Sequence, residues 1–236
     1  MPFATSARSR PRTKQAFVYQ TLRDAIMRCD LVPGERLVID DLARRLQVSS
    51  IPVREALQLL QSDGLIVNVP HVGATVAPIT RESVTDVFTL LEGLGHVAMR
   101  LVAERGDLSQ LDRLDTLVAE MDAALAKSEY ETWAALNTRF HLTMPELTRL
   151  PLLLELTERV FDQWHRVRRY FFHGVLLHRA DHAQAEHRAM LAAMHAADLD
   201  HLAVLVRQHN RGALAAYMAY LDEHAGDEAS QTAGGD

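Results

Sequence analysis

The pattern of apolar and polar positions is clearest between residues 46 and 76, where an amphipathic helix stands between a turn and two short strands. Its apolar positions recur at i, i+3, i+4 and i+7, so one face is expected to be buried and the other free. These positions are Val53, Ala56, Leu57 and Leu60. With two helices before it and a β-hairpin after it, the pattern predicts a winged helix-turn-helix domain over residues 13–78.

The free face of this helix carries Arg54 close to its N-terminal end. A recognition helix presents such residues to DNA, and an arginine there can form a bidentate pair with guanine or a charge-assisted bond to phosphate. Ser49 and Ser50 can cap the helix and contact phosphates. Arg44 and Arg45, just before the turn, are open to two interpretations, phosphate contacts or a solvated helix face. The segment therefore predicts binding to double-stranded DNA.

Beyond residue 78 the apolar positions follow the helical repeat, and no stretch alternates like a strand. Thr80 can cap a helix that runs to about Arg105. Further helical patterns cover residues 108–127, 129–147, 151–173, 180–197 and 199–223. The predicted fold class is mainly α, with an all-α antiparallel bundle of about six helices over residues 79–224. Residues 225–236 are expected to form a disordered tail.

Composition and charge support two modules with different tasks. The chain of 236 residues has a net charge of −6, but residues 1–78 carry a positive balance and the remainder a negative one, which suggests a basic nucleic-acid module joined to an acidic module. Residues 1–12 form a basic tail, either a disordered solubilising segment or a flexible arm that touches phosphates. No apolar run approaches a membrane span and no signal peptide is visible, so a cytoplasmic protein is expected.

Histidines on core-facing stripes are the second informative feature. Three predicted helices direct polar side chains into an apolar face, and these residues are Asn137, His141, His187 and His209. Buried polar groups cost roughly 1–3 kcal/mol each unless they find partners. One divalent ion could satisfy all four, because imidazole suits zinc, nickel, copper or iron. The alternative is that each histidine is a hydrogen-bonded core residue, and helical register by itself leaves both interpretations open.

The DNA-binding half resembles the GntR family of bacterial transcription regulators. The resemblance covers residues 13–78 and is carried by these positions: Val48, Ser49, Pro52, Val53, Arg54, Glu55, Ala56, Leu57, Leu60, Asp63, Gly64, Leu65, Gly73 and Val76, with residues 31–37 upstream. The resemblance implies that the wing tip, residues 70–73, enters or borders the minor groove, where His71 donates a hydrogen bond and Gly73 permits the turn. Ser50 stands where members often carry arginine, so a different operator base is expected at the matching position.

The helical half resembles the FCD ligand-sensing domain of the FadR-like branch of that family. The matching positions are Asn137, Phe140, His141, Glu186, His187 and His209. The resemblance implies that Asn137 and the three histidines hold a divalent metal, with zinc or nickel preferred, and that this metal helps to bind a small organic acid.

Two positions depart from the FCD pattern. Asn137 stands where many metal-binding members carry aspartate, so metal affinity is expected to be lower. Leu91 stands where members commonly place an arginine that faces the effector. Arg168, at the edge of an apolar helix face, is a candidate replacement for that cation in effector binding, and an exposed charge is its alternative interpretation. An effector that is less acidic, or held mainly by the metal, is the resulting hypothesis.

The sequence therefore predicts a ligand-responsive bacterial transcription regulator, by default a repressor, that binds a palindromic operator as a homodimer. One alternative is a DNA-binding protein with a ligand-blind dimerisation domain. Another is a metal-dependent enzyme in which the histidine site activates water. Glu186 is the one acid adjacent to the histidine set in sequence, and its side chain projects about 100° from that of His187 around the helix. No enzyme activity is therefore expected.

Overall fold

The computed structural model describes residues 13–105 and 108–232, and the chain divides into two compact units between Ile79 and Thr80. Each unit has its own buried apolar cluster. The predicted basic tail at residues 1–12, the predicted helix break at residues 106–107 and the last four residues of the predicted C-terminal tail lie outside the described residues.

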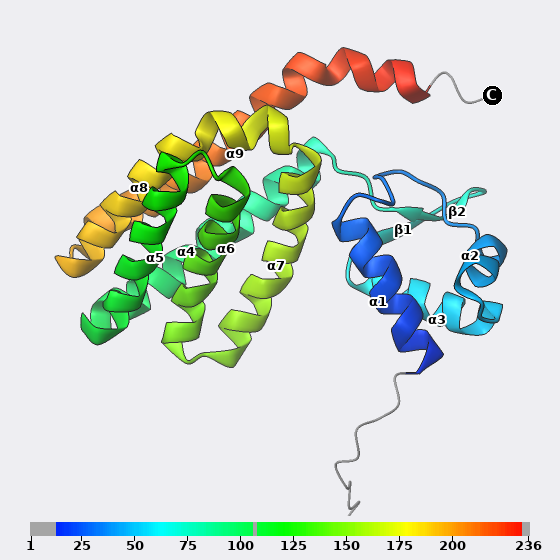
Figure 1. Cartoon of the computed structure of the whole chain (residues 1–236), viewed down its shortest axis with the longest axis horizontal. Coiled ribbons are helices and arrows are strands. Elements are labelled where there is room, and N and C mark those ends of the chain that lie inside the picture. The colour runs from blue at the N-terminus through cyan, green and yellow to red at the C-terminus, as the bar shows by residue number, and fades with distance from the viewer. Residues whose placement is uncertain (1–12, 106–107, 233–236) are drawn as a thin grey trace, which may run out of the picture. The chain divides into compact units, whose positions relative to one another are not determined.

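The first unit contains three helices and a two-stranded antiparallel sheet (Figure 1). Its elements are α1 (Lys14–Met27), α2 (Ile39–Leu46), α3 (Ser50–Ser62), β1 (Ile66–Val69) and β2 (Gly73–Val76). The strands pair from Ile66 opposite Val76 to Val69 opposite Gly73, and Arg36 adds an isolated bridge to Thr75. This is the predicted winged helix-turn-helix, with the hairpin as its wing.

Local backbone chemistry sets the turns of this unit. Gln47 adopts a left-handed conformation with φ of 55° and closes α2, and Gly64, with φ of 72°, follows the end of α3. Glycine adopts positive φ without the penalty that a Cβ brings, so Gly64 suits the entry into β1. The apolar stripe of α3 then packs against α1, and its four members are all buried: Val53, Ala56, Leu57 and Leu60.

The second unit is all-helical in the part of the chain that the structure describes (Figure 1). Its elements are α4 (Arg81–Arg105), α5 (Leu108–Ala126), α6 (Tyr130–Thr148), α7 (Pro151–Tyr170), the π-helical turn η1 (Phe172–Leu176), α8 (Leu177–His195) and α9 (Leu199–Thr232). Helix α4 packs against α6, α7 and α9, and α5 packs against α6 and α8. The predicted bundle of about six helices is confirmed.

The start of α4 shows why the second unit begins where it does. The hydroxyl of Thr80 accepts a 3.2 Å hydrogen bond from the backbone N–H of Ser83, and the hydroxyl of Ser83 accepts one of 2.9 Å from the N–H of Thr80. This reciprocal cap satisfies two N–H groups that the first turn of a helix leaves without intrahelical partners.

The region around Gly174 differs from the prediction of a break between two helices. The chain continues as the π-helical turn η1 and enters α8 at Leu177, three residues before the predicted helix start. Gly174 lies against the ring of Tyr220 on α9, and a Cβ at this position would come within 1.9 Å of Tyr220 Cε2. The missing side chain, rather than backbone flexibility, allows this close approach.

The C-terminal prediction needs a correction, because α9 continues to Thr232 and not to about residue 223. The segment that was expected to be a disordered tail is thus helical through residue 232. It contains no proline, and extending an existing helix by one residue needs no new nucleation. Among the described residues, no helix combines the length and the apolar character needed to cross a membrane.

Candidate functional site

The first candidate site is the free face of the winged helix-turn-helix. Arg54 on α3 is exposed, as are Ser49, Arg44 and Arg45 around the turn, and Ser50 is half-buried. Ser49 occupies the N-cap position of α3 with an extended backbone, but its hydroxyl accepts no capping hydrogen bond. That hydroxyl is therefore available to another partner.

The wing tip lies at the turn between β1 and β2. His71 has a φ of 65° and Gly73 a φ of 99°, and both residues are exposed. Arg44 forms an ion pair with Asp41 along α2. An exposed pair of this kind contributes little free energy, about 0–1 kcal/mol, so Arg44 can exchange it for another anion. The seven residues predicted to contact DNA are accessible or half-buried.

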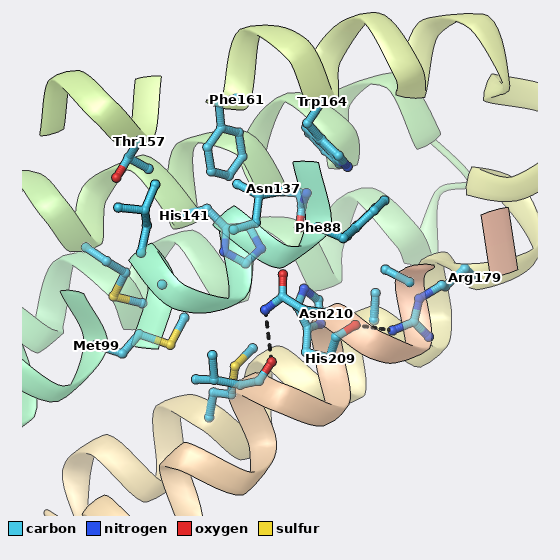
Figure 2. Close-up of a pocket in the computed structure, with 18 of the residues that line it drawn as sticks. Phe88, Met99, Asn137, His141, Thr157, Phe161, Trp164, Arg179, His209 and Asn210 are labelled. Atoms are coloured by element: carbon cyan, nitrogen blue, oxygen red, sulfur yellow. Dashed lines mark hydrogen bonds between the residues drawn. The ribbon is translucent and has the colours of Figure 1, made fainter. Parts of the chain in front are cut away.

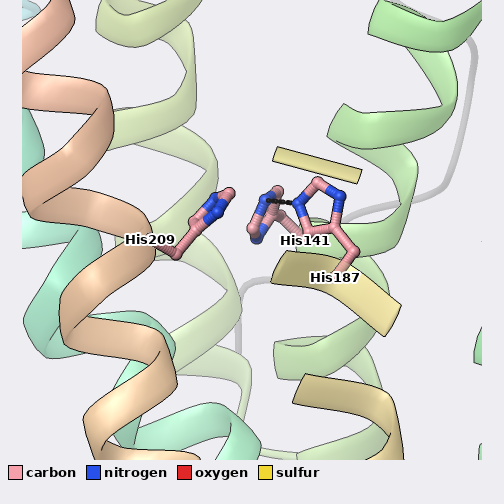
Figure 3. Close-up of side chains that lie close together, drawn as sticks. All are labelled: His141, His187 and His209. Atoms are coloured by element: carbon pink, nitrogen blue, oxygen red, sulfur yellow. Dashed lines mark hydrogen bonds between the residues drawn. The ribbon is translucent and has the colours of Figure 1, made fainter. Parts of the chain in front are cut away.

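The second candidate site is a cluster of three histidines inside the helical unit (Figure 3). His141 on α6, His187 on α8 and His209 on α9 each place a ring nitrogen within 4.8 Å of the others. The Nε2 atoms of His141 and His187 are 3.2 Å apart. Zinc–nitrogen bonds are about 2.1 Å long, so two nitrogens on one ion lie about 3–4 Å apart. The spacing fits a shared divalent ion.

Asn137 lies one turn before His141 on α6. It lies among the residues that line the adjoining cavity, and it is 5% exposed. Its Oδ1 is buried and has no hydrogen-bond donor among the described residues. A buried oxygen without a partner costs about 1–3 kcal/mol, and a cation would remove that cost. Imidazole nitrogens and an amide oxygen are groups that could hold a divalent metal ion.

Hydrogen bonds from neighbouring residues orient two of the imidazoles. Nδ1 of His209 donates a 2.7 Å hydrogen bond to Oε2 of Glu186, and Nε2 is the ring nitrogen that this bond does not use. Nδ1 of His187 lies 3.4 Å from Oε1 of Gln184. Gln184 is fully buried and also accepts a 3.1 Å hydrogen bond from the indole of Trp133. Such outer contacts fix the tautomer that binds a metal.

The electrostatics favour neutral imidazoles. Burial lowers the pKa of His141 to about 3, with a smaller contribution from His209. Burial also lowers the pKa of His187 well below its ordinary value, and His209 and His141 add to this effect. Both rings therefore stay neutral at neutral pH, and their nitrogens keep the lone pairs that a metal requires.

Glu186 remains ionised beside them. Burial alone would raise the pKa of Glu186, but its hydrogen bond and charge interaction with His209 and its pairing with Arg179 together lower it. Nη2 of Arg179 lies 2.7 Å from Oε2 of Glu186. The carboxylate accordingly stays charged and holds both the His209 ring and the Arg179 guanidinium.

A cavity of about 80 Å³ adjoins the histidines (Figure 2). One water takes about 10–15 Å³ on this scale, so the cavity suits a small organic molecule. Its walls combine apolar and polar side chains, which include Phe88, Leu91, Met99, Asn137, His141, Met144, Thr157, Phe161, Trp164, Arg179, His209, Asn210 and Tyr217. His141 and His209 of the histidine cluster line this cavity, as does Asn137.

Arg168, the predicted effector cation, is not among the described residues that line this cavity. Its guanidinium carbon lies 5.1 Å from the ring centroid of Trp164, and Nη2 lies 3.4 Å from Nδ1 of His165. Arg179 of α8 lines the cavity instead. Sequence reasoning missed Arg179 because it lies just after the π-helical turn, which changes the face that a residue presents.

Two family models match the chain, one in each unit. The family described as "Bacterial regulatory proteins, gntR family" matches residues 14–76, and the FCD domain matches residues 86–212. A protein of Bacillus subtilis, "Uncharacterized HTH-type transcriptional regulator YdhC", is 30% identical over 72% of this chain and 75% of its own length. The chain belongs to the GntR family of bacterial regulatory proteins. Its helical unit is an FCD domain, and members are transcription regulators rather than enzymes.

Two further comparisons agree with this assignment. The "HTH-type transcriptional repressor GlaR" of Escherichia coli is 26% identical over 81% of this chain and 90% of its own length. The solved structure of "E. coli McbR/YncC" has a TM-score of 0.67 at 23% identity and covers 88% of this chain and 99% of its own. That likeness shows the shared fold. The GntR-type regulator therefore pairs a DNA-binding domain with an FCD domain.

Proposed function

We propose that this GntR-family regulator is a metal-assisted sensor of a small organic acid and acts as a repressor in the bacterial cytoplasm. It binds a palindromic operator as a homodimer, with one winged helix-turn-helix on each half-site. Arg54 contacts base edges or phosphate in the major groove, Ser49 and Ser50 contact phosphates, and His71 reaches the minor groove from the wing.

The observation that carries the sensing proposal is the convergence of three imidazoles beside an internal cavity. His141, His187 and His209 have ring nitrogens within 4.8 Å of one another, and the buried Oδ1 of Asn137 belongs to a residue of the same cavity wall as His141 and His209. A buried acceptor without a donor calls for an explanation, and a bound cation would supply one. These four residues would hold the divalent ion, which supplies a positive charge for an anionic ligand.

The residues around the cluster have separate tasks in this proposal. Glu186 holds the His209 ring, and Gln184 holds the His187 ring, so each presents Nε2 for ligation. For regulation, the effector must bind the DNA-competent and DNA-incompetent arrangements with different affinity. We take repression as the default because the relative GlaR is described as a transcriptional repressor.

Metal analysis and operator binding of the same purified protein test the proposal. The full-length protein should contain about one zinc or nickel ion per chain, and a gel shift on the promoter DNA beside its gene should change when candidate acids are added. Chelation should remove the response to acids. His187→Ala should reduce bound metal and blunt the response, whereas the same change at the exposed His201 serves as the matched control.

Two other outcomes would replace the proposal. Protein that binds its operator equally with and without metal and acids would be a constitutive DNA-binding protein with a ligand-blind helical domain. Protein whose metal content is unchanged in the His187→Ala variant would not use this residue as a ligand. The dimer and the palindrome are tested by the mass of the protein in solution and by protection of both operator half-sites.

A further inference from the structure

Arg179 is the one residue with a formal charge among the described residues that line the effector cavity. Its side chain is 13% exposed and pairs with Glu186, whose side chain is 15% exposed. Nη2 of Arg179 also donates a 3.0 Å hydrogen bond to the backbone carbonyl of His209. Arg179 therefore lies beside His209 of the histidine cluster in the cavity wall (Figure 2).

The charge balance around Arg179 and the histidine cluster favours the binding of one anion. Arg179 and Glu186 form an ion pair and neutralise each other. Asn137 contributes no charge. A divalent ion held by neutral ligands keeps its full positive charge, so it attracts one carboxylate strongly. Nε of Arg179 is buried without an acceptor among the described residues, which adds an unused donor beside that carboxylate.

The rest of the described cavity lining offers no second charged side chain to another carboxylate. It is largely apolar, with Leu91 on α4, Met144 on α6, and Phe161 and Trp164 on α7, and its remaining polar residues are the neutral Thr157, Asn210 and Tyr217. Phe161 lies close to the cluster, with its ring centroid 5.7 Å from that of His141. A carboxylate buried against such walls without a cation would lose its hydration and gain no partner.

We propose that the effector is a monocarboxylate with an apolar body. Its single carboxylate binds at the metal and Arg179 end, and its hydrocarbon part lies against Leu91, Phe161 and Trp164. At roughly 10–15 Å³ for each water-sized group, a volume of about 80 Å³ limits the molecule to roughly five to eight such groups. This inference rests on the proposed sensing function and names the chemical class that the site selects.

A matched ligand pair tests the proposal with the zinc-loaded, full-length protein. Hexanoate and adipate have the same six-carbon chain and differ by one carboxylate, and hexanamide replaces the carboxylate by a neutral group. Isothermal titration should give hexanoate an affinity at least about tenfold above that of adipate and of hexanamide, because only hexanoate places one charge at the polar end and none elsewhere. Adipate binding as tightly as hexanoate, hexanamide binding as tightly, or binding of none of the three would overturn the proposal.

A positive charge added to the apolar part of the cavity lining should reduce the preference for hexanoate over adipate. Leu91→Arg introduces a cation into the apolar part of the cavity lining and gives the second carboxylate of adipate a partner, so the ratio of hexanoate to adipate affinity should fall at least about tenfold. Leu90→Arg is the matched control, because Leu90 is 52% exposed on the same helix and does not line the cavity. An unchanged ratio in Leu91→Arg, or an equal fall in Leu90→Arg, would contradict the proposed orientation of the ligand.

Failure of this inference can be separated from failure of the proposed function. Protein that binds one metal ion and changes its operator affinity only with dicarboxylates keeps the sensing function and loses the monocarboxylate assignment. Protein that binds hexanoate selectively without any change in operator affinity keeps the ligand class and loses the regulatory role.

Discussion

Nε1 of Trp133 donates a 3.1 Å hydrogen bond to Oε1 of Gln184, and this contact determines which way the buried carboxamide faces. The indole N–H can only donate, so the oxygen must lie on the Trp133 side. The amide nitrogen then donates to the carbonyl of Val118 at 3.1 Å and to Asp122. Since Oε1 also faces Nδ1 of His187 at 3.4 Å, that ring nitrogen carries the proton. Nε2 of His187 is left as the ligand atom.

Gln184→Leu should lower the metal affinity of the protein by about 10–100-fold, because the variant removes the acceptor that holds His187 in its ligating tautomer. Competition with a chromogenic chelator measures the affinity, and the visible absorption of the cobalt(II) form reports changed coordination geometry. Gln208→Leu makes the same change at an exposed site on α9 as a control. Equal metal affinity in Gln184→Leu and the native protein would show that Gln184 has no positioning role.

The metal-free protein should become less stable as the pH falls below about 6.5. His141 has a pKa lowered to about 3 in the folded state, so between these values the unfolded chain binds the proton and the folded chain does not. Each such histidine removes up to about 1.4 kcal/mol of the free energy of unfolding per pH unit. Urea unfolding at pH 7, 6 and 5 with a chelator present should show this slope.

Replacing the imidazole of His141 tests whether this ring causes the dependence of stability on pH. His141→Gln should reduce the dependence of stability on pH below 6.5, and His201→Gln controls for the loss of an exposed imidazole. A His141→Gln variant with the native slope would mean that another group causes the acid destabilisation.

Arg54→Ala should weaken operator binding by about 1–3 kcal/mol, because the side chain is exposed at the start of α3 and contributes a charge-assisted contact to base or phosphate. The variant should keep the native fold by circular dichroism, since Arg54 belongs to no buried cluster. Fluorescence anisotropy with labelled operator measures the loss at a stated salt concentration. Arg159→Ala, an exposed arginine of α7, is the control, and equal binding by both variants would remove Arg54 from the DNA-binding surface.

Gly174→Ala should destabilise the helical domain by about 1 kcal/mol, the low end of overpacking effects. A Cβ at this position would lie 1.9 Å from Cε2 of Tyr220, so the Tyr220 ring would have to leave its packed position against Gly174. Gly93→Ala is a matched control on α4, because nothing lies within 4 Å of its added Cβ and the change should be neutral or stabilising by up to about 1 kcal/mol. Thermal unfolding of both variants checks the difference, and equal unfolding temperatures would argue against the close packing at Gly174.

Local patterns predicted much of this protein because they act through neighbours in the chain. The stripe of α3 indicated its buried face, Thr80 indicated the start of α4, and the inward register of His141, His187 and His209 was visible from the spacing of apolar residues around each one. The prediction for the segment after His224 was wrong. Its polar composition suggested a disordered tail, but its backbone continues α9 to Thr232.

The sequence by itself determined the element types, the two-domain organisation expected from charge, and the residue types that face inward, since helical periodicity places residues on one face regardless of what lies opposite. Only the tertiary structure decided that the three imidazoles meet, that Glu186 and Gln184 orient two of them, and that Arg179 rather than Arg168 lines the cavity. These relationships join residues up to 68 positions apart in the case of His141 and His209. Distances between separate helices depend on how the helices pack, and no local pattern encodes them.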